Sequence, residues 1–242
     1  MNILILSAGS SHGAGGDDYP SCLAEVNGIP LLQRLVSESA GLNPEKIIFA
    51  FQQAQIDKFH LDHVAQRLSD RAEVFGVSER TQGAACTILS GVHHIDNDQE
   101  LLIMNANELV RADLVEIVQS FRDRKLAAGT ITFPSVHPRY SYVRLGDAGL
   151  VTEAAEKNPI SNNATGGIYW FANGALFVQC AMSMIRKDAR VNGKFYICPV
   201  FNEIILKGFK VGVFPINSDQ YTPLKTERQL EAYEVSAGRG SA

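Results

Sequence analysis

The sequence predicts an α/β protein with a Rossmann-like, mixed but mostly parallel central sheet and helices on both faces. Short apolar runs bounded by turn residues alternate with amphipathic stretches of helical length from the N-terminus onward, the order typical of a parallel sheet. The 242 residues, 45% of them hydrophobic, are enough to form one large core. After residue 127 the strand patterns follow one another more closely, which indicates a second half built onto the same sheet.

In the first half, each expected strand is short and apolar and each expected helix is amphipathic. The expected strands are residues 2–6, 46–51, 73–77 and 100–104. The expected helices are residues 31–40, 57–69, 83–91 and 112–124. Pro30 and Gly41 flank the first of these helices, at the positions that proline and glycine favour at helix ends.

The second half continues without a Pro/Ser-rich linker. Its expected strands are residues 128–133, 141–145, 151–156, 167–171 and 210–214. Its expected helices are residues 175–185, 200–207 and 226–235. We therefore expect a single domain over residues 1–235, in two halves that meet between residues 127 and 128, and a disordered tail of small and polar residues at 236–242.

Charge and composition exclude several classes of protein. The formal net charge is −4 and no long basic run occurs, so nucleic acid is not an expected partner. No apolar run reaches the roughly 20 residues that span a bilayer, and the short apolar N-terminus lacks the basic region of a signal peptide. The four cysteines are far apart in the sequence, which favours reduced thiols. We therefore expect a cytoplasmic protein without a membrane partner.

Small residues follow the first expected strand, where a doubly wound sheet binds its ligands. The turn consists of Ser7, Ala8, Gly9, Ser10 and Ser11. Small side chains let a phosphate or a base approach the backbone, and successive N–H groups can hold an anion. The turn is neither a P-loop nor a dinucleotide fingerprint, so by itself it is weak evidence for a ligand.

The segment after this turn makes the evidence specific. The Ala-Gly turn, Pro20, Leu23, Gly28 and Pro30-Leu31 keep the order and spacing of a family motif. In that motif a strand leads into A-A-G-x-G-x-R, then P-K-x-L, then G-x-P-x-L before a helix. The chain thus resembles the sugar-phosphate nucleotidyltransferases, which include the molybdopterin-guanine nucleotide synthases, over roughly residues 1–235.

The resemblance implies a GT-A-like fold and a reaction in which a sugar phosphate attacks the α-phosphorus of a nucleoside triphosphate and releases pyrophosphate. It makes residues 1–127 the nucleotide-binding half and residues 128–235 the sugar-binding half. The implied nucleotide-binding residues are Ser7, Ala8, Gly9, Ser10, Ser11, Ser21, Gln82 and Gly83. The implied sugar-binding residues are Glu156, Lys157, Gly167 and Tyr169. Residues 190–196 look like those of small bacterial members from surface-polysaccharide pathways.

Several charged residues of the motif are replaced. Gly13 stands in the place of the family's Arg, Ser21 in that of its Lys, and Asn107 in that of its metal-binding Asp. With these replacements, the expected catalytic residues are Lys157, Asn107 and Asp219. Asn107 and Asp219 are expected to be the ligands of Mg²⁺. Each lost charge is one that phosphoryl chemistry uses to stabilise its transition state.

Three functions stay open at this point. The first is an active nucleotidyltransferase with a modified metal site, acting on a nucleoside triphosphate and a sugar phosphate. The second is a catalytically impaired relative that binds a nucleotide or a nucleotide-sugar as a sensor or a partner subunit. The third is a glycosyltransferase of the same fold, which the missing Asp-x-Asp at residues 105–107 disfavours. The sequence is compatible with a homo-oligomer.

Overall fold

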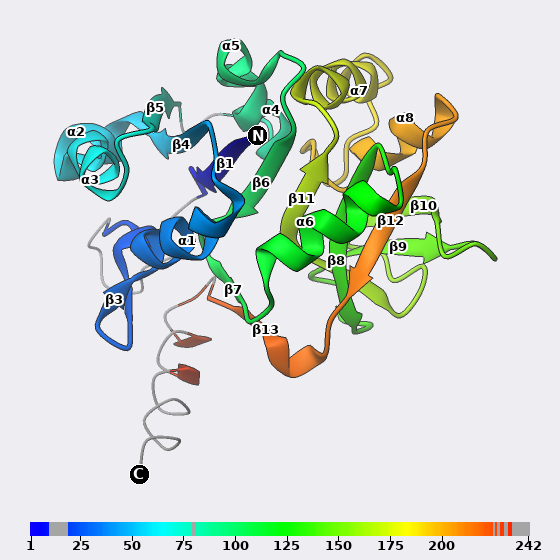
Figure 1. Cartoon of the computed structure of the whole chain (residues 1–242). Coiled ribbons are helices and arrows are strands. Elements are labelled where there is room, and N and C mark those ends of the chain that lie inside the picture. The colour runs from blue at the N-terminus through cyan, green and yellow to red at the C-terminus, as the bar shows by residue number, and fades with distance from the viewer. Residues whose placement is uncertain (10–18, 79–80, 225, 227, 230–231, 234–242) are drawn as a thin grey trace.

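The computed structural model describes residues 1–9, 19–78, 81–224, 226, 228–229 and 232–233. One large sheet runs through the molecule in the order β10-β9-β11-β6-β1-β4-β5, with β8 beside β11 and β12 beside β8 (Figure 1). Its strands are β1 (Asn2–Ser7), β4 (Lys46–Gln52), β5 (Ala72–Val77), β6 (Leu101–Asn105), β8 (Ala128–Pro134), β9 (Ser141–Leu145), β10 (Val151–Glu156), β11 (Asn163–Phe171) and β12 (Val211–Pro215).

Strand direction in the sheet changes between the two halves of the chain. β1 is parallel to both of its neighbours, β4 and β6, and β4 is parallel to β5. β11 is antiparallel to β6 and β8, and β10 is antiparallel to β9. The expected fold class, a mixed and mostly parallel sheet between helices, is therefore confirmed.

Helices cover both faces of the sheet, as the alternation along its strands requires. Ile3 and Ile5 of β1 pack with α1 (Leu31–Ser39), α3 (Leu61–Leu68) and α6 (Leu114–Asp123). Leu4 points to the opposite face and packs with α4 (Ala84–Ser90), α5 (Val92–Ile95), α7 (Gly174–Arg186) and α8 (Val200–Leu206). Two hydrophobic cores thus fix the sheet and leave its strand ends accessible for a ligand.

The structure differs from the expected elements in a few places. The helix expected over residues 57–69 is two helices, α2 (Gln53–Phe59) and α3, because His60 between them adopts the left-handed conformation with φ 52°. The first half also contains the short pair β2 (Glu25–Val26) and β3 (Ile29–Pro30) and the 3₁₀ turns η1 (Ser21–Leu23) and η2 (Ala40–Leu42). Half of the helix expected at 226–235, and all of the expected tail at 236–242, lie outside the described residues.

One further strand pair was not predicted and matters for the site. β7 (Glu108–Val110) pairs antiparallel with β13 (Tyr221–Pro223), which follows the 3₁₀ turn η3 (Ser218–Gln220). The pair brings the C-terminal part of the chain back to the end of β6. Among the described residues, no helix is both long enough and apolar enough to cross a membrane.

Candidate functional site

A cleft of about 560 Å³ lies where the parallel strands β1 and β4 end. This is the edge of an open α/β sheet at which ligands bind, and the volume suits a nucleotide-sized molecule. Its lining comes from both halves of the chain: Leu6, Ala8, Gly9, Gln52, Ala54, Gln55, Lys58, Phe59, Thr81, Gly83, Ala84, Thr87, Lys194 and Tyr196.

The turn after β1 forms one wall of the cleft and is held by a side chain from β4. The buried amide of Gln52 donates to the carbonyl oxygens of Ala8 and Gly9, at 3.2 and 3.3 Å. The carbonyl oxygen of Leu6 accepts from the Ala106 N–H at 3.0 Å, which ties the same turn to the end of β6. Two neighbouring strands therefore fix the backbone that a nucleotide would contact.

Gly83, which directly precedes α4, also lines the cleft, and its backbone conformation and surroundings favour glycine. Its φ is +106°, a conformation that side chains with a Cβ rarely adopt. A Cβ placed there would lie 2.4 Å from the carbonyl oxygen of Phe195 and 2.8 Å from its nitrogen. The glycine therefore allows the 190–196 segment to approach the backbone of the first half of the chain.

A tight hairpin builds that segment. Val191 and Lys194 exchange backbone hydrogen bonds at 2.9 and 3.0 Å, and both residues between them have positive φ: Asn192 at 49° and Gly193 at 74°. Asn-Gly is the pair that a two-residue hairpin turn of this kind favours. Phe195 then docks onto the first half: its N–H donates to the Gln82 carbonyl at 2.7 Å, and its carbonyl accepts from the Ala85 N–H at 3.1 Å.

Lys157, which directly follows β10, contacts the same segment. Its ammonium donates to the Tyr196 hydroxyl at 2.9 Å and lies 5.1 Å from the centre of the Tyr196 ring. The bond to Tyr196 raises the pKa of Lys157 above its ordinary value, so the ammonium stays charged. Next to it, Glu156 ends β10 as a buried carboxylate that accepts from the Ser141 hydroxyl.

Two more lysines carry positive charge to the cleft. Lys58 of α2 and Lys194 of the hairpin line it from different elements. Together with the charged ammonium of Lys157 beside Tyr196, they make this edge of the sheet suitable for a phosphorylated ligand. No role for Lys58, Lys194, Tyr196 or Gln52 was predicted from the sequence. Only the position of Gln52 at a strand end was a signal for such a role.

The two expected metal ligands do not share a site. Asn107 begins the β7–β13 pair, and its carbonyl accepts from the Leu224 N–H at 2.8 Å. Asp219 lies at the other end of that pair, in the exposed turn η3, where Gln220 is bonded to Arg111. The residues between them separate the two by more than roughly 10 Å of extended chain.

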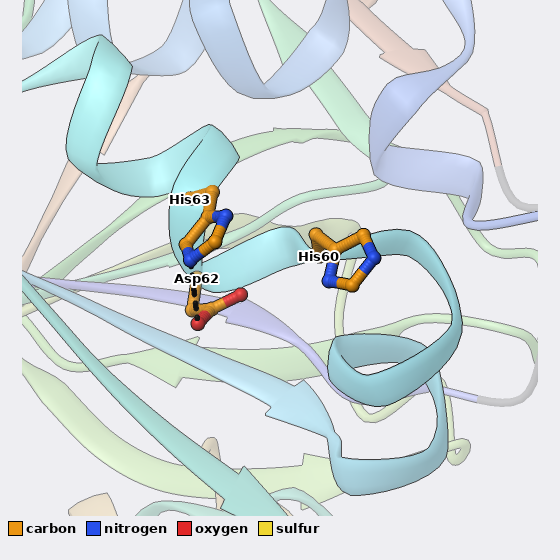
Figure 2. A group of neighbouring side chains, drawn as sticks. All are labelled: His60, Asp62 and His63. Atoms are coloured by element: carbon orange, nitrogen blue, oxygen red, sulfur yellow. Dashed lines mark ion pairs between the residues drawn. The ribbon is translucent and has the colours of Figure 1, made fainter.

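The carboxylate next to Asn107 does not complete a magnesium site. Glu108 is buried, and its side chain accepts from the Asn105 amide at 3.1 Å. In the part of the chain that the structure describes, the single group of three close metal-binding side chains is elsewhere: His60, Asp62 and His63, whose ligand atoms lie within 4.8 Å of one another (Figure 2). None of these three lines the cleft. The described residues therefore form no cluster of three His, Cys, Asp or Glu side chains at the end of β6.

The remaining expected residues have mixed placements. Ala8, Gly9 and Gly83 line the cleft, Ser7 and Gln82 adjoin it in sequence, and Ser21 is exposed at the start of η1 and is not a lining residue. Ser10, Ser11 and Gly13 lie outside the described residues.

Gly167 and Tyr169, expected at the sugar, have structural roles. A Cβ on Gly167 would lie 2.5 Å from a Glu108 oxygen, so the glycine lets β11 pass this buried side chain. Tyr169 is buried in the core, and its hydroxyl is 3.1 Å from that of Thr165. The Tyr169 ring therefore packs inside the protein and does not line the cleft.

Comparisons with known proteins agree with this architecture. A structure of a nucleoside-diphosphate-sugar pyrophosphorylase from Vibrio cholerae has a TM-score of 0.84 at 19% identity, over 97% of this chain and 100% of the other. That of the inositol-1-phosphate CTP transferase from T. maritima has a TM-score of 0.71 at 11% identity, over 98% and 94% of the two chains.

A sequence relative matches most of the chain. The UTP–glucose-1-phosphate uridylyltransferase AglF of Haloferax volcanii is 24% identical over 206 residues, which are 83% of this chain and 81% of AglF. The family model described as nucleotidyl transferase matches residues 17–196, which include the hairpin and the cleft-lining residues from Gln52 to Tyr196. The chain therefore belongs to the nucleotidyl transferase family.

Proposed function

We propose that the protein transfers a nucleoside monophosphate from a nucleoside triphosphate to a sugar phosphate and releases pyrophosphate. The observation that carries this proposal is the position of Lys157, one hydrogen bond away from a residue that lines the nucleotide-sized cleft. A nucleotide in the cleft and a phosphate on Lys157 would lie side by side. Proximity of the two reactants supplies a large part of the catalysis in such reactions.

The residues have the following roles in this proposal. The backbone at Ala8, Gly9 and Gly83 holds the nucleoside, and Lys58 and Lys194 face its phosphates in place of the family's replaced Arg and Lys. Lys157 binds the phosphate of the sugar. An oxygen of that phosphate attacks the α-phosphorus of the nucleotide, and the bond to pyrophosphate breaks. Mg²⁺ enters with the triphosphate as part of the substrate, since this ion is often held largely by phosphates and water.

The cellular setting is also a proposal. The four cysteines are unpaired thiols, three of them buried, which supports a cytoplasmic location. A part in surface-polysaccharide biosynthesis is supported by the resemblance of residues 190–196 to family members of such pathways. The replaced charges at Gly13, Ser21 and Asn107 favour a second function, the binding of a nucleotide or nucleotide-sugar without turnover.

Pyrophosphate release tests the proposed reaction. The protein is incubated with Mg²⁺, each of the four common nucleoside triphosphates and a panel of sugar phosphates that includes glucose 1-phosphate. We expect pyrophosphate only where a triphosphate and a sugar phosphate are both present. Release from a triphosphate alone would contradict the transfer reaction. Nucleotide-sugar binding without any release would favour the second function.

Replacing Lys194 by glutamine is expected to weaken triphosphate binding by about fivefold at low salt, because one charge is removed from the wall of an open cleft. The difference should shrink as salt increases, since screening weakens exposed charge pairs. Calorimetric titration with UTP, CTP, GTP and ATP measures it. Lys207→Gln is the matched control, because Lys207 is exposed and does not line the cleft. Equal affinities of the wild type and Lys194→Gln at low salt would remove Lys194 from the site.

A further inference from the structure

Tyr196 connects the two halves of the proposed site. It follows Phe195, which is held between the Gln82 carbonyl and the Ala85 N–H of the nucleotide-binding half. Its own side chain lines the cleft, and its hydroxyl accepts the hydrogen bond from Lys157. Within one dipeptide, the chain is bonded to the wall of the nucleotide cleft and to the lysine of the sugar side.

The hairpin leaves Tyr196 little freedom to move. The Asn192-Gly193 turn closes the hairpin, Phe195 is buried, and the Arg190 guanidinium lies 5.5 Å from the centre of the Phe195 ring. Gly83 keeps the contact close, because any Cβ at that position would overlap the Phe195 backbone. The backbone from which the Tyr196 side chain extends is therefore held beside the cleft.

Lys157, by contrast, is exposed and has a long side chain with many conformers. Its backbone is fixed in the left-handed conformation with φ 55°, and its N–H donates to the Tyr140 carbonyl at 3.0 Å. The Tyr196 hydroxyl fixes the other end of the side chain. With both ends fixed, the ammonium is placed beside the cleft before any ligand arrives.

We propose that Tyr196 is a positioning residue that holds the Lys157 ammonium at the junction of the nucleotide cleft and the sugar-phosphate side. The inference rests on the proposed function and adds the residue through which the two half-sites are joined. Because Tyr196 acts through Lys157, its hydroxyl should matter only while the lysine is present.

A double-mutant cycle tests this inference, with UDP-glucose binding by calorimetry and pyrophosphate release from UTP and glucose 1-phosphate as readouts. If another pair gives the higher rate in the panel above, that pair and its nucleotide-sugar are used instead. Tyr196→Phe removes the hydroxyl and keeps the ring. We expect it to weaken nucleotide-sugar binding and to raise the KM for the sugar phosphate by about 2- to 10-fold, the range of a single net hydrogen bond. The affinity for the triphosphate alone should not change.

The Lys157→Ala variant and the double variant show whether Tyr196 acts by positioning Lys157 or by contacting the ligand itself. Lys157→Ala should weaken nucleotide-sugar binding by about tenfold, and adding Tyr196→Phe to it should change nothing further. Tyr142→Phe is the matched control, since it removes a hydroxyl bonded to the His137 carbonyl in the same half of the chain. It should leave the KM for the sugar phosphate unchanged, whatever its effect on thermal stability.

Two results would overturn the inference while leaving the proposed function standing. In one, the effects of Lys157→Ala and Tyr196→Phe add, which would mean that the tyrosine contacts the ligand by itself. In the other, Tyr196→Phe has no effect in an active wild type. If the wild type neither binds a nucleotide-sugar nor releases pyrophosphate with any pair in the panel, the proposed function fails, and this inference fails with it.

Discussion

Gly83→Ala is expected to weaken nucleotide binding by roughly tenfold or more, equivalent to at least about 1.4 kcal/mol. The new Cβ would lie 2.4 Å from the carbonyl oxygen of Phe195, so the hairpin would have to move away from α4. This movement would displace Lys194 and Tyr196 from the cleft that they line. Together with the unfavourable φ of +106°, the change should also lower the free energy of unfolding by about 2 kcal/mol.

Chemical denaturation and calorimetric titration measure the two effects. Gly149→Ala is the matched control: Gly149 also has a positive φ, +67°, but nothing lies within 4 Å of its added Cβ. It should cost about 1 kcal/mol of stability from backbone strain alone and leave binding unchanged. Wild-type affinity in a folded Gly83→Ala protein would show that the contact between the hairpin and α4 does not shape the nucleotide site.

Asn107→Asp is expected to raise Mg²⁺-dependent pyrophosphate release on the order of 10²-fold, if the site is otherwise competent. Asp and Asn are nearly equal in size, and Asn107 is half-buried at the start of the β7–β13 pair, so the fold should tolerate the change. The substitution restores a carboxylate where the family resemblance places the ligand of the magnesium–triphosphate complex.

Rates with and without EDTA measure the dependence on Mg²⁺. Asn217→Asp makes the same chemical change in an exposed position outside the cleft, and it should not alter the rate. A silent wild type with an active Asn107→Asp variant would identify a relative that has kept its binding site and lost its turnover. If the wild type already releases pyrophosphate rapidly and Asn107→Asp does not raise the rate, Asn107 does not limit catalysis.

The fold could be predicted well from the sequence because its signals are local. The apolar run of β1 alternates between the two cores, and α1 begins directly after the proline that the sequence places there. The break between α2 and α3 was missed, since the amphipathic pattern continues through His60 and does not show its left-handed backbone. β7 and β13 were missed because each is only three residues long and is defined by a partner far away in the sequence.

The site was predictable only in part, because some of its residues are brought together by contacts between distant parts of the sequence. The turn at Ala8 and Gly9 follows a strand, and the family spacing located Gly83, so both were found from the sequence. The roles of Lys194 and Tyr196 depend on the contact of Phe195 with residues more than 100 positions earlier. No local pattern reports such a contact. The relative placement of Asn107 and Asp219 was not predictable for the same reason, because it depends on the antiparallel register of β7 and β13, which puts the two residues at opposite ends of the pair.

The reverse reaction tests most directly the central claim that one site holds the nucleotide and the sugar phosphate side by side. The wild type and Asn107→Asp are each given Mg²⁺, radiolabelled pyrophosphate and a UDP-, dTDP-, CDP- or GDP-sugar. We expect label to enter the nucleoside triphosphate with at least one nucleotide-sugar, in the wild type or in Asn107→Asp, and we expect Gly83→Ala to reduce its entry. If no label entered any triphosphate with either folded protein, the two ligands would not share one catalytic site.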